Sequence, residues 1–410
     1  MPSHAFAMIT PHGDPLGRIG EPDIGGQCIY VRELSAHLAK AGHAVSIFTR
    51  NRRDGKPDQD EYAPGATVYR IPCGPPGFIP KEELGAHLPE FADAVRSRLS
   101  GNEILHSHYW DGGSVVMMLR AKAPWFHTTH SIGKLKQAAL PDGEQYRYGE
   151  RIAIETDTYR GCDRVVALTE TEKQQIADLY DVPEERIVVI PPGVNTQDFR
   201  PVEDKIALRR ELGLPPNAVI VFALGRLDER KGFDLLFEAA ARAQAADLPE
   251  TLYVFSAGDG SAGEAAERAK IERILETNQL EKAVRWIPVI PEADLPRYYA
   301  AADVFVLPSR YEPFGIVMLE AMASQIPIIA TSAGGPATVI EQERSGLLVD
   351  PTDTEALANA LTMLIRSPNT RLHYGERARA AAVADYSWQA IADRHLVAYE
   401  AALEEDRNAR

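Results

Sequence analysis

The segment Tyr311–Ala323, YEPFGIVMLEAMA, contains two glutamates in different surroundings. Glu312 precedes a proline and Glu320 is embedded in an apolar run. Because proline favours the first helical position, the pattern predicts a helix that begins at Pro313, with Glu312 as its N-cap and Glu320 about two turns later. Eight helical residues span ~12 Å along the axis, whereas the carboxylates of a glycosidase lie ~5–9.5 Å apart. We therefore expect these carboxylates to accept hydrogen bonds from a long, hydroxyl-rich ligand.

Two cations, Arg226 and Lys231, lie in LGRLDERKG after a predicted strand. A pair of fixed cations neutralises a diphosphate leaving group without a metal ion, and the N–H groups after Glu312 also favour an anion. Together these features fit a nucleotide-sugar, which joins two sugars through a diphosphate. The simpler alternatives are an ordinary charged loop, a Glu312 that only caps its helix, and a Glu320 on the polar side of that helix.

Paired glycines, Gly25 and Gly26, open a helix predicted from about Gln27 to Ala41. They let a ligand approach the backbone and leave the helix N-terminus free for an anion, although generic loop glycines fit equally well. The dinucleotide pattern G-x-G-x-x-G is absent here. The apolar side of this helix is predicted to contain Val31, Leu34, Leu38 and Ala41.

Three histidines end predicted strands: His106 and His108 in ILHSHYW, and His130 in WFHTTH. At the carboxyl end of a strand, a histidine can bind a sugar hydroxyl or stabilise developing charge; a structural role is the alternative. The His-x-His pair has no carboxylate partner at a metal-binding spacing, and the acidic stretch at residues 58–60 is predicted to lie in a solvated loop. We expect neither a metal nor another cofactor to be required.

Short apolar runs alternate with helical patterns along the chain, which predicts parallel sheets of the α/β class. A buried-strand pattern ends at the Pro-Pro-Gly of RIVVIPPGVNTQDF. This break predicts two doubly wound, Rossmann-like domains, residues 1–198 and 199–385, facing each other across a ligand cleft. A last helix within residues 386–410 has apolar positions at Ile391, Leu396 and Leu403, and is expected to pack back on the first domain.

Composition excludes several classes of protein. The 410 residues are 45% hydrophobic with a formal net charge of −15, so we expect a globular protein without a basic face for nucleic acid or an anionic membrane. Its three cysteines, Cys28, Cys73 and Cys162, are widely spaced, which favours a reducing compartment. With no apolar stretch long enough to span a membrane and no export signal, the expected location is cytoplasmic.

The motifs GGQ, GRLDERKG and YEPFGIVMLEAMASQIPIIATSAGGPATVI resemble those of the family-4 retaining glycosyltransferases of the GT-B fold. The resemblance covers nearly the whole chain. Within that family, DIGGQCIYVRELSAHLAKAGH, FIPKEEL, SHYWDGG, HTTHSIGKLK and VIPPGVNTQDF are similar to sucrose-phosphate synthases and sucrose synthases. The resemblance implies glucose transfer from UDP- or ADP-glucose to fructose 6-phosphate in sucrose biosynthesis, with a sucrose-phosphate phosphatase acting downstream. It leaves the donor base, GDP included, open.

On the donor side, the resemblance implies that Arg226 and Lys231 hold the diphosphate and Glu320 the ribose. The transferred glucose would contact Glu312 and, near its reacting carbon, His130. The catalytic set is thus His130, Glu312, Arg226 and Lys231. The donor-binding set is Gly26, Arg226, Lys231, Glu312, Phe314, Gly315 and Glu320.

On the acceptor side, the resemblance implies that Lys81 and Arg151 hold the 6-phosphate. Without the resemblance, both would be ordinary solvated cations. The family often has a cation cluster before AIE, where this chain has Gly149 and Glu150. The remaining acceptor-binding residues would be Gly25, Gly26, Gln27 and Tyr109.

No carboxylate lies in a motif suited to a covalent glycosyl intermediate, so front-face attack with retention is the expected mechanism. Cleft closure would exclude water from the donor. Free fructose as acceptor, as in a sucrose synthase, and the mannosylfructose-phosphate synthase reaction are alternatives. A lipid acceptor would require a basic amphipathic patch, which the amino-terminal half lacks. An inactive nucleotide-sugar-binding protein is the alternative of a different class.

Overall fold

The computed structural model describes residues 3–18, 21–120, 122–138, 148–244, 246–258, 262–287 and 289–409. The chain divides into two compact units, the first formed by Met1–Pro192 with Trp388–Arg410 and the second by Gly193–Ser387. The first boundary lies between residues 192 and 193, whereas the sequence pattern predicts it between residues 198 and 199. The chain returns to the first unit at Trp388, two residues later than residue 386.

The first unit contains one sheet in the order β3-β4-β2-β1-β5-β6-β7-β8. Its pairings are parallel except between β3 and β4. The strands are β1 (Ala5–Ile9), β2 (Ala44–Asn51), β3 (Gln59–Ala63), β4 (Ala66–Pro72), β5 (Glu103–His108), β6 (Trp125–Thr128), β7 (Arg164–Ala167) and β8 (Ile187–Val189). Residues 59–63 therefore form an edge strand, and the prediction of a solvated loop at 58–60 is wrong for most of that stretch because the chain there pairs with β4.

Helices cover both faces of this sheet, which explains why its central strands are apolar throughout. One hydrophobic cluster unites the sheet with α1 (Gly26–Lys40) and α15 (Trp388–Ala409). The cluster on the other face includes α2 (Leu88–Arg96), α3 (Tyr109–Leu119), α5 (Gly149–Gly161) and α6 (Glu170–Tyr180). The short α4 (Gly133–Ala138) follows β6.

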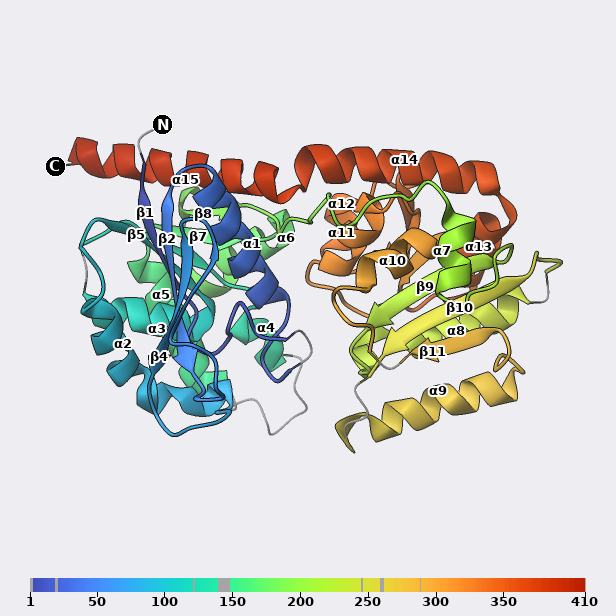
Figure 1. Cartoon of the computed structure of the whole chain (residues 1–410), viewed down its shortest axis with the longest axis horizontal. Helices are drawn as coiled ribbons and strands as arrows, with labels where there is room; N and C mark the ends of the chain where they lie inside the picture. The colour runs from blue at the N-terminus through green and yellow to red at the C-terminus, as the bar shows by residue number, and fades with distance from the viewer. Residues whose placement is uncertain are drawn as a thin grey trace. The chain divides into compact units, whose positions relative to one another are not determined.

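The last helix, α15, packs against α1 (Figure 1). Ile391 and Leu396 are buried in their shared cluster and Leu403 packs against it, as expected from their helical spacing. On α1, Val31, Leu34 and Leu38 are buried as predicted, but Ala41 is exposed. It follows the last helical residue, so it no longer shares the apolar side of the helix.

The second unit has a parallel sheet in the order β11-β10-β9-β12-β13-β14. This is the strand order of a Rossmann fold. The strands are β9 (Val219–Gly225), β10 (Thr251–Ala257), β11 (Val284–Ile287), β12 (Val304–Leu307), β13 (Ile328–Thr331) and β14 (Gly346–Val349). The helices are α7 (Lys205–Glu211), α8 (Phe233–Ala243), α9 (Ala265–Thr277), α10 (Leu295–Ala301), α11 (Ile316–Ala323), α12 (Pro336–Val339), α13 (Thr354–Arg366) and α14 (Pro368–Asp385).

Each sheet reverses its strand order at one point, between β1 and β5 in the first unit and between β9 and β12 in the second. Loops leave the carboxyl ends of the strands on opposite sides of such a point, so ligands bind there. The described helices include none that is both long and apolar enough to cross a membrane. Cys28, Cys73 and Cys162 are buried and free.

Candidate functional sites in the two units

In the second unit, the loops after β9 and β12 join through an ion pair. Lys231 Nζ lies 2.7 Å from Glu312 Oε2, and the Ser309 hydroxyl donates to the same oxygen at 3.1 Å. Both charged side chains are largely buried, with exposed fractions of 14% and 9%. The structure therefore brings together two of the residues predicted to bind the donor.

Glycine allows these loops to approach so closely. Gly232, which follows Lys231, has a φ of 66°, and a Cβ there would lie 2.1 Å from the carbonyl oxygen of Pro308. Gly334 behaves in the same way, because its Cβ would lie 2.1 Å from the carbonyl oxygen of Glu312. The backbone around Glu312 is thus enclosed by neighbouring loops.

The predicted helix start is wrong. The helix α11 begins at Ile316, and its N-cap is Gly315 with a φ of 89°, a left-handed conformation that cannot continue a helix. Glu312 lies before this break, where its N–H donates to the Ala333 carbonyl at 3.2 Å. The ~12 Å spacing obtained from the helical rise therefore does not apply to Glu312 and Glu320.

Glu320 is 7% exposed within α11, so the alternative that it lies on the polar side of the helix is wrong. Burial raises the pKa of its carboxyl group to about 7, although a hydrogen bond with Tyr299 acts in the opposite direction. Its Oε2 atom has no hydrogen-bond partner among the described residues. A buried acceptor without a partner suits a ligand hydroxyl group.

The other predicted donor residues are placed differently. Arg226 is 79% exposed at its side chain, and its Nε lies 3.8 Å from Asp228, so it contributes no buried charge to the Lys231–Glu312 pair. Phe314 is buried, and a Cβ on Gly335 would lie 2.4 Å from its Cα. It shapes the loop before α11.

Sequence reasoning missed a second connection between the same loops. Arg310 donates to both oxygens of the buried Asp234, at 2.9 and 2.7 Å, and its backbone N–H donates to the Arg230 carbonyl at 2.8 Å. Lys270 lies 2.5 Å from Asp234. Burial alone would raise the pKa of Asp234, but the Arg310 and Lys270 side chains lower it to about 2. No local motif marks this pairing, since the partners are 76 residues apart.

In the first unit, Arg151 is fixed rather than solvated. It is 6% exposed, and its Nε donates to Glu155 at 2.6 Å. One Nη atom donates to the Tyr109 hydroxyl at 2.7 Å and the other to the Ser131 carbonyl at 2.8 Å. The guanidinium also lies 4.5 Å from the centre of the Tyr109 ring, and Lys136 Nζ lies 5.9 Å from it. The solvated-cation alternative is wrong for Arg151.

Lys81 is half-buried, and its Nζ lies 2.6 Å from Asp23, so it too is no freely solvated cation. This contact raises the pKa of Lys81 against the opposing effect of burial. Burial raises the pKa of the Tyr109 hydroxyl, and the positive charges of Arg151 and Lys81 oppose that increase. Lys81, Tyr109 and Arg151 therefore form one cationic neighbourhood.

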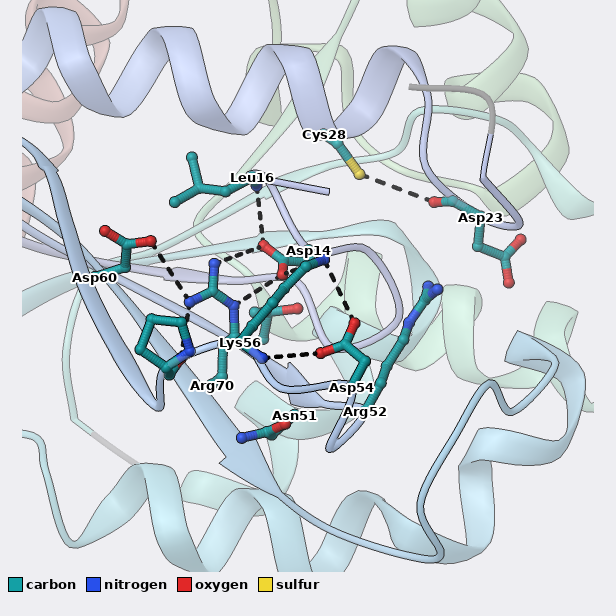
Figure 2. A network of polar contacts seen from close by, with 12 residues as sticks. Asp14, Leu16, Asp23, Cys28, Asn51, Arg52, Asp54, Lys56, Asp60 and Arg70 are labelled. Carbon is teal, nitrogen blue, oxygen red and sulfur yellow. Dashed lines mark hydrogen bonds and ion pairs between the residues drawn. The ribbon is translucent and has the colours of Figure 1, made fainter. Parts of the chain in front are cut away.

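The loop between β1 and α1, which carries Asp23, is anchored by buried charges that the sequence did not reveal (Figure 2). Asp14 accepts from Arg70 Nε at 2.8 Å and from the Leu16 N–H at 2.9 Å. Burial opposes ionisation, but these hydrogen bonds lower the pKa of Asp14. Arg52 also donates to the carbonyl oxygens of His12 and Pro22, at 3.3 and 3.1 Å.

The paired glycines lie where this loop enters α1. Gly25 is the N-cap and Gly26 the first helical residue, and no described side chain caps this end. A Cβ on Gly25 would meet no atom within 4 Å, so the space beside it is open. Gln27 donates to the Thr10 hydroxyl at 3.1 Å.

His130 lies two residues after β6, with a left-handed φ of 55°. Its Nε2 is 3.1 Å from His108 Nδ1. Burial lowers the pKa of His130 to about 3, which keeps the imidazole neutral at pH 7. His106 is fully buried between the Tyr399 and Thr128 hydroxyl groups, a structural role. Within the described ranges, no three His, Cys, Asp or Glu side chains gather as metal ligands.

Two family models match the chain: Glycosyltransferase Family 4 over residues 24–198 and Glycosyl transferases group 1 over residues 204–381. A D-inositol 3-phosphate glycosyltransferase of Acidothermus cellulolyticus is 36% identical, covering 98% of this chain and 91% of that protein. A D-inositol 3-phosphate glycosyltransferase 2 of Catenulispora acidiphila is 33% identical, covering 98% and 96%. The solved structure of sucrose-phosphate synthase from Thermosynechococcus elongatus matches with a TM-score of 0.85 and 34% identity, covering 98% of this chain and all of that one.

Proposed function

Because the chain belongs to the group 1 and family 4 glycosyltransferases of the GT-B fold, we propose that it transfers glucose from a nucleotide-glucose to a phosphorylated polyhydroxyl acceptor. The cationic neighbourhood of Lys81, Tyr109 and Arg151 carries this proposal. A buried arginine that lies over a phenol ring, with a lysine nearby, is suited to a phosphate group. Free fructose has no phosphate group and therefore could not form ion pairs with these cations.

Two phosphorylated acceptors are supported by different comparisons. Fructose 6-phosphate, giving sucrose 6-phosphate, is supported by the 34% identity and the TM-score of 0.85 to the sucrose-phosphate synthase. Inositol 3-phosphate is supported by relatives of 33–36% identity that are named for it. Both place one phosphate beside several hydroxyl groups, so the same cations serve either acceptor. We take fructose 6-phosphate as the first candidate.

On the donor side, the proposed ribose contact is Glu320. Its buried Oε2 has no hydrogen-bond partner among the described residues, so it could accept from a ribose hydroxyl group. Lys231 is proposed to move from Glu312 to the diphosphate, which releases the Glu312 carboxylate to accept from hydroxyl groups of the transferred sugar. Arg226, whose side chain is largely exposed, would add its charge when the diphosphate binds. Phe314 and Gly315 would shape the sugar-binding loop, and Gly26 the backbone approach.

In the proposed reaction, an acceptor hydroxyl oxygen attacks the anomeric carbon on the face from which the diphosphate departs. The bond between that carbon and the phosphate oxygen breaks, and a phosphate oxygen takes the proton of the acceptor hydroxyl. Fixed dipoles and cations stabilise the separated charges. His130, kept neutral by burial, acts as a hydrogen-bond partner of the sugar and carries no charge of its own.

The test is a matrix of UDP-glucose, ADP-glucose and GDP-mannose against fructose 6-phosphate, inositol 3-phosphate, fructose and inositol. Released nucleoside diphosphate and product mass would be measured. The proposal expects turnover with a glucose donor and a phosphorylated acceptor, at least about tenfold above the unphosphorylated counterpart, since a charge-assisted hydrogen bond contributes ~1.5–3 kcal/mol. Equal turnover with the unphosphorylated acceptors, or none at all, would refute it.

A further inference from the structure

A pair of imidazoles, His108 buried and His130 partly buried, connects β5 to the proposed sugar contact. His108, the last residue of β5, has Nδ1 at 3.1 Å from His130 Nε2. The Tyr30 ring packs edge-on against both imidazoles, with centroids at 5.9 and 5.2 Å. Two neutral rings at this distance share one hydrogen, so one donates and the other accepts.

The position of His108 is fixed from behind. Its ring stacks on His106 at a centroid distance of 4.3 Å. His106 is held through both ring nitrogens, with Nδ1 at 2.6 Å from the Tyr399 hydroxyl of α15 and Nε2 at 2.7 Å from the Thr128 hydroxyl. His108 therefore packs against a ring that is itself held by a buried network, which extends to the last helix.

The hydrogen-bond partners of the two His108 ring nitrogens indicate which of the two rings donates. Its Nε2 is buried and has no hydrogen-bond partner among the described residues. A proton on Nε2 would leave a buried N–H donor unpaired, which folded proteins rarely tolerate, whereas an unpaired ring lone pair costs less. A proton on Nδ1 is instead used in the bond to His130. The proton of His108 therefore belongs on Nδ1.

We propose that His108 is a positioning residue that donates from Nδ1 to His130 Nε2 and thereby holds His130 in the tautomer protonated at Nδ1. His130 then offers an N–H donor, instead of a lone pair, from its other nitrogen. This suits an oxygen atom of the transferred sugar, a step that depends on the proposed function, whereas the tautomer itself does not. The left-handed backbone of His130 is consistent with a ring held in one orientation.

The tautomer is tested without substrate. Nitrogen-15 NMR of the full chain labelled at histidine distinguishes protonated from bare ring nitrogens. The expected result for the wild type is a protonated Nδ1 and a bare Nε2 on both His108 and His130. A protonated Nε2 on His130 would overturn the proposal.

Two substitutions separate the hydrogen bond from the packing. H108F keeps a flat ring in the core but removes the donor, so we expect His130 to populate the Nε2-protonated form and kcat to fall by about tenfold or more, with KM changed less. H108Q offers an amide N–H and should retain more of the Nδ1-protonated form. H127F is the matched control, because His127 is equally buried but bonds through Nδ1 to Ser107.

A His130 tautomer unchanged in H108F would refute the positioning role, as would an equal change in H127F. If H108F does not fold, a bare Nδ1 on His108 in the wild type would refute it. A confirmed tautomer in a protein without glycosyltransferase activity would instead disprove the proposed function and leave the positioning role in place.

Discussion

Replacing Glu320 with glutamine should stabilise the unliganded protein while weakening donor binding. The pKa of Glu320 is raised from 4.5 to about 7 because burial disfavours the ionised form. The folded state therefore holds this proton more tightly than the unfolded state. The stability that results is fully present below pH 4.5 and is lost as the pH rises through 7.

The magnitude follows from the two pKa values. A difference of about 2.5, at 1.36 kcal/mol for each pKa unit, corresponds to ~3 kcal/mol. At pH 8 the wild-type protein has lost this contribution, whereas a neutral glutamine does not ionise. We expect E320Q to be more stable than the wild type by up to ~3 kcal/mol at pH 8, with little of this gain at pH 5.

Donor binding should change in the opposite direction. If the Glu320 carboxylate accepts from ribose hydroxyls, its loss removes hydrogen bonds to a charged group, which are worth ~1.5–3 kcal/mol, so the Kd of the nucleotide-sugar should rise about 10- to 100-fold. Urea unfolding at pH 5 and 8 and donor titration by calorimetry measure the two effects. A stability difference that is the same at both pH values would refute the electrostatic reasoning, and unchanged donor affinity would refute the ribose contact.

Three further substitutions test other parts of the two sites. K81M should raise KM for a phosphorylated acceptor about 10- to 100-fold, since it removes a charge-assisted contact, and should leave donor affinity unchanged; steady-state kinetics would contradict this if both KM values rose together. R310K keeps the charge but loses the bidentate bond to Asp234, so donor KM should rise with acceptor KM unchanged. The control is R297K, at an arginine whose side chain is 42% exposed, and it should change neither KM. G232A should destabilise the protein by more than ~1 kcal/mol, because its Cβ would lie 2.1 Å from the Pro308 carbonyl oxygen; an unchanged unfolding midpoint would contradict the close approach of the two loops.

The fold class was predictable because apolar runs and helical periodicity are local signals. Segments such as AFAMI and VIVFALG are buried on both faces, and they became β1 and β9. The start of α11 was not predictable in the same way. Pro313 is an ordinary first helical residue, but Gly315 adopts a left-handed conformation. The residue before Pro313, Glu312, pairs with the distant Gly334, a contact that the local sequence does not specify.

The charged residues show the same division. The residue types and local context of Lys231, Glu312 and Glu320 indicated a ligand site. The structure places Lys231 against Glu312 and buries Glu320. The anchoring pairs Asp14–Arg70 and Asp234–Arg310 join residues 56 and 76 positions apart. Each appears in the sequence as a common charged residue, and only the sheet topology brings the partners together.

Backbone strain gives a reason to regard the first-unit site as preorganised. Left-handed backbone at a residue other than glycine costs roughly 1–3 kcal/mol and persists only when surrounding contacts enforce it. Three such residues each contact a polar partner: Asp23 with Lys81 at 2.6 Å, Tyr109 with Arg151 at 2.7 Å, and His130 with His108 at 3.1 Å. These contacts hold the strained residues in place before a ligand binds. Binding therefore costs less, because fewer side chains have to be ordered. The side chains proposed to meet the acceptor and the sugar are therefore held in place by the fold itself.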